Sequence, residues 1–280
     1  MSLSSLMLQS CEGCLPFKTL TQLSGRLAQA KMGAFTTLLI KNFIQTFNIN
    51  LEECANPDPA AYATFNDFFI RKLKEGVRPV AQDCKAVCPA DGTMGASGMV
   101  KEGTLIQAKG IDYALIDLVG GDRQDAALFE EGGYATVYLS PSNYHRVHMP
   151  LKATLLRTVH IPGKLYPVGQ RNITGMPGLY TKNERLVCFF DCEGATLALI
   201  LVGAALVGSI GTVWDGTVIR TEQVARQDLR ERRLTLERGA EMGHFKYGST
   251  VIVLWPSSLG RCRAELTPGT TVQMGQALVV

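Results

Sequence analysis

Three residues of the sequence have side chains whose types together could activate a serine hydroxyl: Asp91, His148 and Ser249. Each lies on or beside a turn that is flanked by short apolar runs. A carboxylate can fix the tautomer of an imidazole, and the imidazole can then take the proton of an attacking hydroxyl. Spacing along the chain does not show that the three side chains meet. The Gly-x-Ser-x-Gly elbow of ordinary hydrolases is absent, which counts against an ordinary esterase.

The junction between Gly248 and Ser249 is the place where a serine could attack the chain itself. Glycine has no Cβ, so the carbonyl of Gly248 is sterically open. The apolar, β-branched run Val251 to Leu254 predicts a buried strand directly downstream. Taken alone, Gly-Ser-Thr is more typical of an ordinary turn that enters a strand. Whether Ser249 is a reactive serine or an ordinary turn residue must be judged from the rest of the sequence.

Two of the four histidines lie in one short stretch, between Ser140 and Pro150. Ser140 followed by Pro141 is typical of the start of a helical turn, which would place His145 and His148 on one face. Two histidines fall short of a metal site and no third ligand is near in the sequence, so we expect no bound metal. His244 is interpreted as a loop residue.

The elements that must position these residues change character along the chain. Residues 15–48 have helical periodicity, which Gly33 should interrupt, and 62–73 are expected to form a further helix after the stop at 56–59. The only charged residues from 15 to 50 are basic: Lys18, Arg26, Lys31 and Lys41. A basic amphipathic helix pair can cap a protein core or lie on an anionic membrane surface.

From residue 80 onward, short apolar runs alternate with Gly, Pro, Asp and Asn. The runs 135–139, 186–190 and 196–202 are typical of short antiparallel strands. The uncharged stretch 195–211 is shorter than a typical spanning helix and is interrupted by glycines, so we expect two buried strands there. The fold class predicted is α+β, with N-terminal helices followed by a predominantly antiparallel β-sheet domain.

Composition excludes several classes of function. The net charge of +3 is small and scattered, so nucleic acid is not expected as a partner. The eight cysteines lack the paired spacings of a four-ligand zinc site and are expected to be reduced thiols. The N-terminus is not typical of a signal peptide.

Several motifs then follow one another in a set order and resemble those of the prokaryotic-type phosphatidylserine decarboxylases over nearly the whole chain. The matching stretches are Phe65-Asn-Asp-Phe-Phe-Ile-Arg-Lys-Leu73, Arg78-Pro79, Pro89-Ala-Asp-Gly92, Lys109-Gly110 with Tyr113, Tyr144-His-Arg-Val-His-Met-Pro150, Pro162-Gly163, Asn183-Glu-Arg185, Val202-Gly-Ala204, Val207-Gly-Ser-Ile210, Glu241-Met-Gly-His-Phe245 and Gly248-Ser-Thr250. One departure is Tyr247, where the family often has Leu or Phe.

The resemblance implies that the protein processes itself before it acts on a substrate. Ser249 would attack the carbonyl of Gly248, with His148 as base and Asp91 as its orienter. The cut would give a β chain, 1–248, and an α chain, 249–280, which begins with a covalent pyruvoyl (pyruvate) cofactor derived from Ser249. That group would form a Schiff base with phosphatidylserine and release CO2, leaving phosphatidylethanolamine. His145 is implied as a proton donor.

The resemblance also implies an organisation and a location. Residues 1–58 would form an amphipathic, membrane-associating helical segment, and 59–280 the catalytic domain. The protein would be peripheral, on the cytoplasmic side of the cell membrane, and the two pieces would form a non-covalent heterodimer, with further dimerisation open. Two alternatives stay open: a pyruvoyl-dependent decarboxylase of a soluble amino acid, and a non-catalytic β-rich binding module in which Ser249 is never cut.

Overall fold

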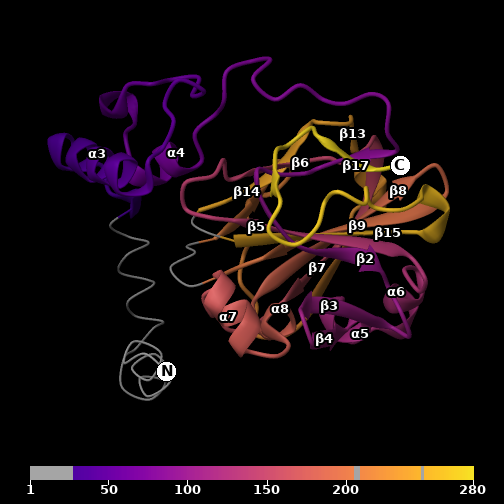
Figure 1. Ribbon diagram of the computed structural model, residues 1–280. Helices are drawn as coiled ribbons and strands as arrows, with labels where there is room; N and C mark the ends of the chain where they lie inside the picture. Colours follow the sequence, from indigo (N-terminus) through magenta and orange to yellow (C-terminus); the bar gives the residue numbers. More distant parts are fainter. Residues whose placement is uncertain (1–27, 205–208, 247–248) are drawn as a thin grey trace.

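The structure is a computed structural model that describes residues 28–204, 209–246 and 249–280 (Figure 1). The predicted helical periodicity of 15–27 and the predicted cleavage-site glycine, Gly248, lie outside these residues. The described chain consists of a helical segment and a larger body of antiparallel strands. The predicted α+β fold class, with a predominantly antiparallel sheet, is confirmed.

A large antiparallel sheet forms the centre of the body, in the order β12-β7-β8-β9-β15-β5-β2-β16, with β13 paired to β7. Its strands are β2 (Gly92–Met99), β5 (Gly133–Leu139), β7 (Ala153–Ile161), β8 (Arg185–Cys192), β9 (Ala195–Val202), β12 (Ala225–Asp228), β13 (Thr235–Leu236), β15 (Ser249–Trp255) and β16 (Thr271–Val272). The buried members are rich in β-branched and aromatic residues, as expected for strands covered on both faces.

Strand β15 lies between β9 and β5 and is hydrogen-bonded to both. All seven of its residues are buried. Side chains alternate along a strand, and two apolar clusters divide accordingly. Val251, Val253 and Trp255 pack in one cluster, whereas Ile252 and Leu254 pack in the other. Opposite Trp255 stands Gly133, where an added Cβ would lie 2.2 Å from the indole ring, so only glycine fits.

A second sheet has the order β11-β10-β14-β6, and two pairs, β1-β17 and β3-β4, complete the body. These strands are β1 (Ala86–Val87), β3 (Thr104–Ala108), β4 (Ile111–Ala114), β6 (Arg146–His148), β10 (Ile210–Thr212), β11 (Gly216–Thr217), β14 (Glu241–Phe245) and β17 (Ala277–Val279). The short helices here are α5 (Leu115–Leu118), α6 (Arg123–Ala127), α7 (Gln170–Gly175), α8 (Leu179–Lys182), η3 (Arg230–Arg232) and η4 (Ser257–Leu259).

Two sequence predictions need correction. The stretch Ser140–Pro150 is not helical at the histidines, because Arg146–His148 pair with β14 as strand β6. The helix predicted over 62–73 is only α4, Phe65–Phe69. Thr64 and Asp67 form a capping box at its start, and Ile70 leaves the helical conformation. The predicted strands in 195–211 are found as β9 and β10.

The helical segment comprises α3 (Ala34–Phe47), η2 (Pro59–Ala61) and α4, and lies at one end of the body (Figure 1). Helix α3 ends where Asn48 adopts the left-handed conformation with φ 48°. A separate apolar cluster joins α3 to α4, and it continues beyond residue 58, the boundary drawn from sequence. None of the helices among the described residues has the length and apolar character needed to cross a membrane.

Phe43 is the aromatic anchor between the two helices, with ring centroids 5.0 Å from Phe65 and 5.9 Å from Phe69. We predict that Phe43→Ala lowers the protection of α3 amides against hydrogen exchange by about 2–3 kcal/mol, because truncating a packed aromatic removes its contacts. Amides of β15 should keep their protection, since the side chains of β15 pack in apolar clusters separate from the cluster that contains Phe43. Phe35→Ala is the matched control, because that ring is 49% exposed. Equal losses in α3 and β15 would contradict this division.

Candidate active site

Ser249 is the first residue of β15 and lies opposite Leu139 of β5. Its side chain is fully buried, and its Oγ has no hydrogen-bond partner among the described residues. Strand alternation places it on the same face as Val251 and Val253. Thr250 lies on the opposite face, so its hydroxyl is not beside that of Ser249. Buried hydroxyls normally have partners. Among the described residues, the hydroxyls of Tyr113, Thr136, Tyr180 and Thr250 also lack one, and Ser249 differs from these four in directly following the carbonyl of Gly248 in the chain.

The hydrogen bonds of His148 define which of its ring nitrogens can act as a base. Its Nδ1 lies 2.8 Å from the carbonyl oxygen of Gly239, which can only accept, so Nδ1 carries the proton. Its Nε2 lies 3.1 Å from the hydroxyl of Tyr144, which therefore donates to it. Burial lowers the pKa of His148, although the Gly239 carbonyl and Glu241 oppose this. The imidazole is thus a neutral base with its lone pair on Nε2.

Asp91 is buried, and the cation that it pairs with is Arg78. Arg78 donates to both carboxylate oxygens, with Nη2 to Oδ2 at 2.7 Å, and the backbone N–H of Met274 donates to Oδ1 at 2.9 Å. The same Nη2 of Arg78 also donates to Glu53 at 2.7 Å. The buried carboxylate is thus paired with a cation and also accepts a backbone hydrogen bond.

The structure brings Asp91 and His148 into one neighbourhood, because the backbone N–H of His148 donates to the carbonyl of Pro89 at 2.8 Å. Among the described residues, however, the hydrogen bonds of a relay are not formed, neither from Asp91 to His148 nor from His148 to Ser249. Gly239 fixes the histidine tautomer, the task that the sequence interpretation gave to Asp91. The relay of these three residues therefore stays a prediction.

His145 is completely buried beneath the helical segment. Its ring centroid lies 4.1 Å from that of Phe69, and its Nδ1 donates to the carbonyl of Asn143 at 2.9 Å. Its Nε2 has no partner among the described residues. Burial, and then the charge of Arg71, lower the pKa of His145 to about 3. In this state Nε2 is a proton acceptor, so the predicted donor role would require His145 to be charged first.

Arginines tie the helical segment to the loop that carries His145. Arg146 donates from Nε to the carbonyl of Ile70 at 2.8 Å and pairs with Glu241 at 2.6 Å. Arg71 is buried and donates to the carbonyl of Ser142 at 3.1 Å. Arg71 is a candidate from sequence for the lipid headgroup or the membrane surface, with a solvated helix face as the alternative, whereas in the structure it is buried. The contact of Arg146 with the helical segment gives no sequence signal beyond its place between the two histidines.

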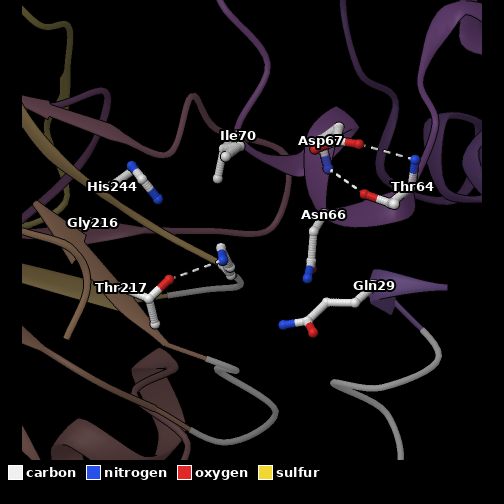
Figure 2. Close-up of a pocket in the computed structure, with 9 residues that line it drawn as sticks. Gln29, Thr64, Asn66, Asp67, Ile70, Gly216, Thr217 and His244 are labelled. Atoms are coloured by element: carbon white, nitrogen blue, oxygen red, sulfur yellow. Dashed lines mark hydrogen bonds between the residues drawn. The ribbon is translucent and has the colours of Figure 1, made fainter. Parts of the chain in front are cut away.

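A cavity of about 390 Å³ opens between the helical segment and strands β11 and β14 (Figure 2). The residues that line it are Gln29, Thr64, Asn66, Asp67, Ile70, Gly216, Thr217, His244 and Lys246. His244 is a strand residue, not a loop residue as interpreted from sequence. It covers Gly211, where an added Cβ would lie 2.4 Å from the ring. Burial lowers the pKa of His244 to about 4, so the ring is neutral.

The site suits a small carbonyl group built on Ser249. Such a group is covalently attached, so it needs no separate binding motif, and the unpartnered Oγ marks a position where a polar atom is already enclosed. Among the described residues, no cluster of His, Cys, Asp or Glu has the arrangement of a metal site.

The ion pair of Arg78 with Asp91 gives a stability prediction. We expect Arg78→Met to lower the free energy of unfolding by about 3–5 kcal/mol, because it leaves the Asp91 carboxylate buried without its cation. Urea unfolding at neutral pH measures this. Arg230→Met is the matched control, since its pair with Asp228 is exposed and should contribute nothing measurable. Similar losses in both variants would contradict the assignment.

Comparison with known proteins identifies the family of this chain. Residues 65–280 match the family model described as "Phosphatidylserine decarboxylase", and 13–48 match a model described as "PSD". The relatives include proteins named phosphatidylserine decarboxylase proenzyme from Acidovorax ebreus, 44% identical, Delftia acidovorans, 45% identical, and Chromobacterium violaceum, 45% identical. Each alignment covers 94% of this chain and 94–95% of the relative. The chain belongs to the phosphatidylserine decarboxylase family.

Proposed function

We propose that the protein is a self-cleaving proenzyme of a carboxy-lyase that converts phosphatidylserine to phosphatidylethanolamine and CO2. Family membership supports the reaction. The single structural observation that supports the processing is the buried, unpartnered hydroxyl of Ser249 at the start of the central strand. Leaving a buried hydroxyl unsatisfied costs about 1–3 kcal/mol, a cost expected where the group has a chemical task.

The cut requires one attack and one elimination. The Oγ of Ser249 attacks the carbonyl carbon of Gly248, and the peptide nitrogen leaves that carbon, so the amide becomes an ester. Loss of the Cα proton of residue 249 then expels the Gly248 carboxylate, and water releases ammonia from the remaining enamine. A neutral His148 with a lone pair on Nε2 is suited to take the hydroxyl proton once Tyr144 moves aside.

The resulting pyruvoyl carbonyl would supply an electron sink for CO2 loss. The chain's own residues would enclose it: β5 pairs with residue 249, β9 pairs with β15 from Thr250 onward, and the helical segment covers His145. Burial lowers the pKa of His145 and keeps the ring neutral. Because Nε2 is closed off from water, it would exchange a proton only with a group inside the site.

The fragment 249–280 would remain bound after the cut. It supplies β15, which pairs with both neighbours, as well as β16 and β17. Separating it would expose the edges of β9 and β5 and an apolar cluster on each side of the sheet. A non-covalent heterodimer of the two pieces follows from this pairing.

The first prediction for this function concerns the cut. Purified wild-type protein should migrate as two pieces on denaturing electrophoresis, whereas Ser249→Ala should stay full-length because it lacks the attacking oxygen. His148→Ala should be cut at least ~100-fold more slowly, the usual contribution of a general base. Ser257→Ala, in the exposed η4 turn, is the control and should be cut like wild type. A folded wild-type protein that stays full-length would contradict the proposal.

We further propose that residues 1–58 attach the enzyme to the cytoplasmic face of the cell membrane. Helix α3 exposes Phe35 and Leu38, which are 49% and 62% accessible, and carries Lys41 with no acidic residue. An apolar face with a cation suits an anionic phospholipid surface. The substrate, with its acyl chains in the bilayer, would then meet the enzyme there.

The membrane prediction uses the double variant Phe35→Ser with Leu38→Ser. We expect at least about a tenfold loss of binding to vesicles of phosphatidylglycerol and phosphatidylcholine. Each substitution removes the favourable free energy of transferring an apolar side chain from water into the membrane interface. Sedimentation with vesicles measures the bound fraction. Ile219→Ser is the control, since Ile219 is 84% exposed but lies outside the helical segment. Equal binding by the double variant and wild type would contradict attachment through α3.

A further inference from the structure

The cavity beside β14 has a distinctive chemical lining. Lys246 is its only cation among the described residues, and its Nζ donates to the Thr217 hydroxyl at 3.3 Å, a long hydrogen bond. No ion pair is formed by Lys246 within the described parts of the chain. A lysine on a cavity wall without an acidic partner keeps its positive charge available to a ligand.

Two amide side chains face the same space from the helical segment. Figure 2 shows the side chains of Asn66 and Gln29 extending into the same space from different directions. Asn66 is 5% exposed, and its Oδ1, which can only accept, has no partner among the described residues. The group of Asn66 that can donate to an anion is its Nδ2–H2, and Figure 2 shows this nitrogen at the tip of the side chain. Gln29 is exposed and makes no hydrogen bond within them. Amide N–H groups near an ammonium group form a donor set that an oxygen anion can accept from.

The remaining polar groups do not neutralise this set. Asp67 lines the cavity, and its Oδ2 accepts from the backbone N–H of Thr64 at 3.1 Å in the capping box of α4 (Figure 2). His244 is neutral because burial lowers its pKa to about 4. The cavity therefore combines one cation that has no ion-pair partner among the described residues, two neutral amides, and one carboxylate that is engaged in the capping box.

The position of Lys246 links the cavity to the reacting residue. Lys246 precedes Ser249 by three residues, so their Cα atoms lie within about 11 Å of each other in the uncut chain. The backbone N–H of Lys246 donates to Ser209 at 3.1 Å, which holds it independently of the junction that is cut. In phosphatidylserine four bonds separate the amine from the phosphorus, about 5 Å. A phosphate in the cavity could thus place the amine toward residue 249.

We propose that this cavity is the subsite for the phosphodiester of the lipid headgroup, with Lys246 as the charge partner and Asn66 and Gln29 as neutral donors. The inference rests on the proposed function and deepens it. The wall of the cavity that carries Asn66 and Gln29 belongs to the helical segment, which also exposes Phe35 and Leu38. A lipid whose phosphate is bound in the cavity would therefore have its acyl chains near the surface proposed to face the membrane. The subsite selects a phosphodiester, whatever group the headgroup carries beyond it.

The test measures binding without any reaction. In the full-length Ser249→Ala protein, which cannot form the reactive group, isothermal titration calorimetry gives the Kd for dihexanoyl-phosphatidylserine and for dihexanoyl-phosphatidylglycerol. The second lipid shares the phosphodiester but has neither amine nor carboxylate. We expect Lys246→Gln to weaken both about tenfold, the usual effect of losing a charge-assisted hydrogen bond. Gln29→Ala, at an exposed position where folding is not at risk, should weaken both about two- to threefold.

Lys109→Gln is the matched control, an exposed lysine on the turn between β3 and β4, and should leave both Kd values unchanged. Unchanged binding in Lys246→Gln and Gln29→Ala would overturn the subsite. A loss for phosphatidylserine alone would also overturn it, because Lys246 would then bind the carboxylate. Inorganic phosphate that binds as tightly as the lipids would show a free-phosphate site instead. Failure of the proposed function would appear separately, as wild-type protein that is neither cut nor active.

Discussion

The pairing of β15 with β9 on one side and β5 on the other is the constraint on which the rest of the structure depends. It fixes residue 249 at the mouth of a fully buried strand and removes its side chain from water. A hydroxyl enclosed in this way has lost its bonds to solvent and has gained none from the described protein. The sheet thus holds Ser249 in place and, after the proposed cut, would also hold the fragment that begins with residue 249.

Around this strand, buried charges join the helical segment to the catalytic body. Arg78 bridges Glu53, from the helical side, and Asp91 of the body, while Arg146 connects Glu241 to the carbonyl of Ile70. Breaking one partner of such a pair is costly, since the other charge stays buried. The helical segment is therefore fastened to the loops that carry Asp91 and His145, which would hold the proposed membrane-binding surface and the proposed reacting residue on one frame.

Much of this could be predicted from the sequence, because strong local signals agreed with the fold. The apolar, β-branched run after Ser249 indicated the buried strand, and ordered motifs identified the family. The local geometry of His145 and His148 could not be predicted, since Ser140-Pro141 resembles a helix start whereas pairing with β14 imposes a strand. Nor could the partners of Asp91 and His148, because Arg78 and Gly239 approach them only through tertiary packing. His244 gave no pattern that distinguished a cavity wall from a loop.

We propose that Ser249 is a precursor, which acts once on its own backbone and ceases to be serine. Intact mass measurement of the small fragment from purified wild-type protein tests it most directly. We expect a fragment 249–280 lighter by one ammonia than a chain that begins with serine, and heavier by two hydrogens after treatment with borohydride. A fragment that retains an N-terminal serine, or a chain that is never cut, would contradict it.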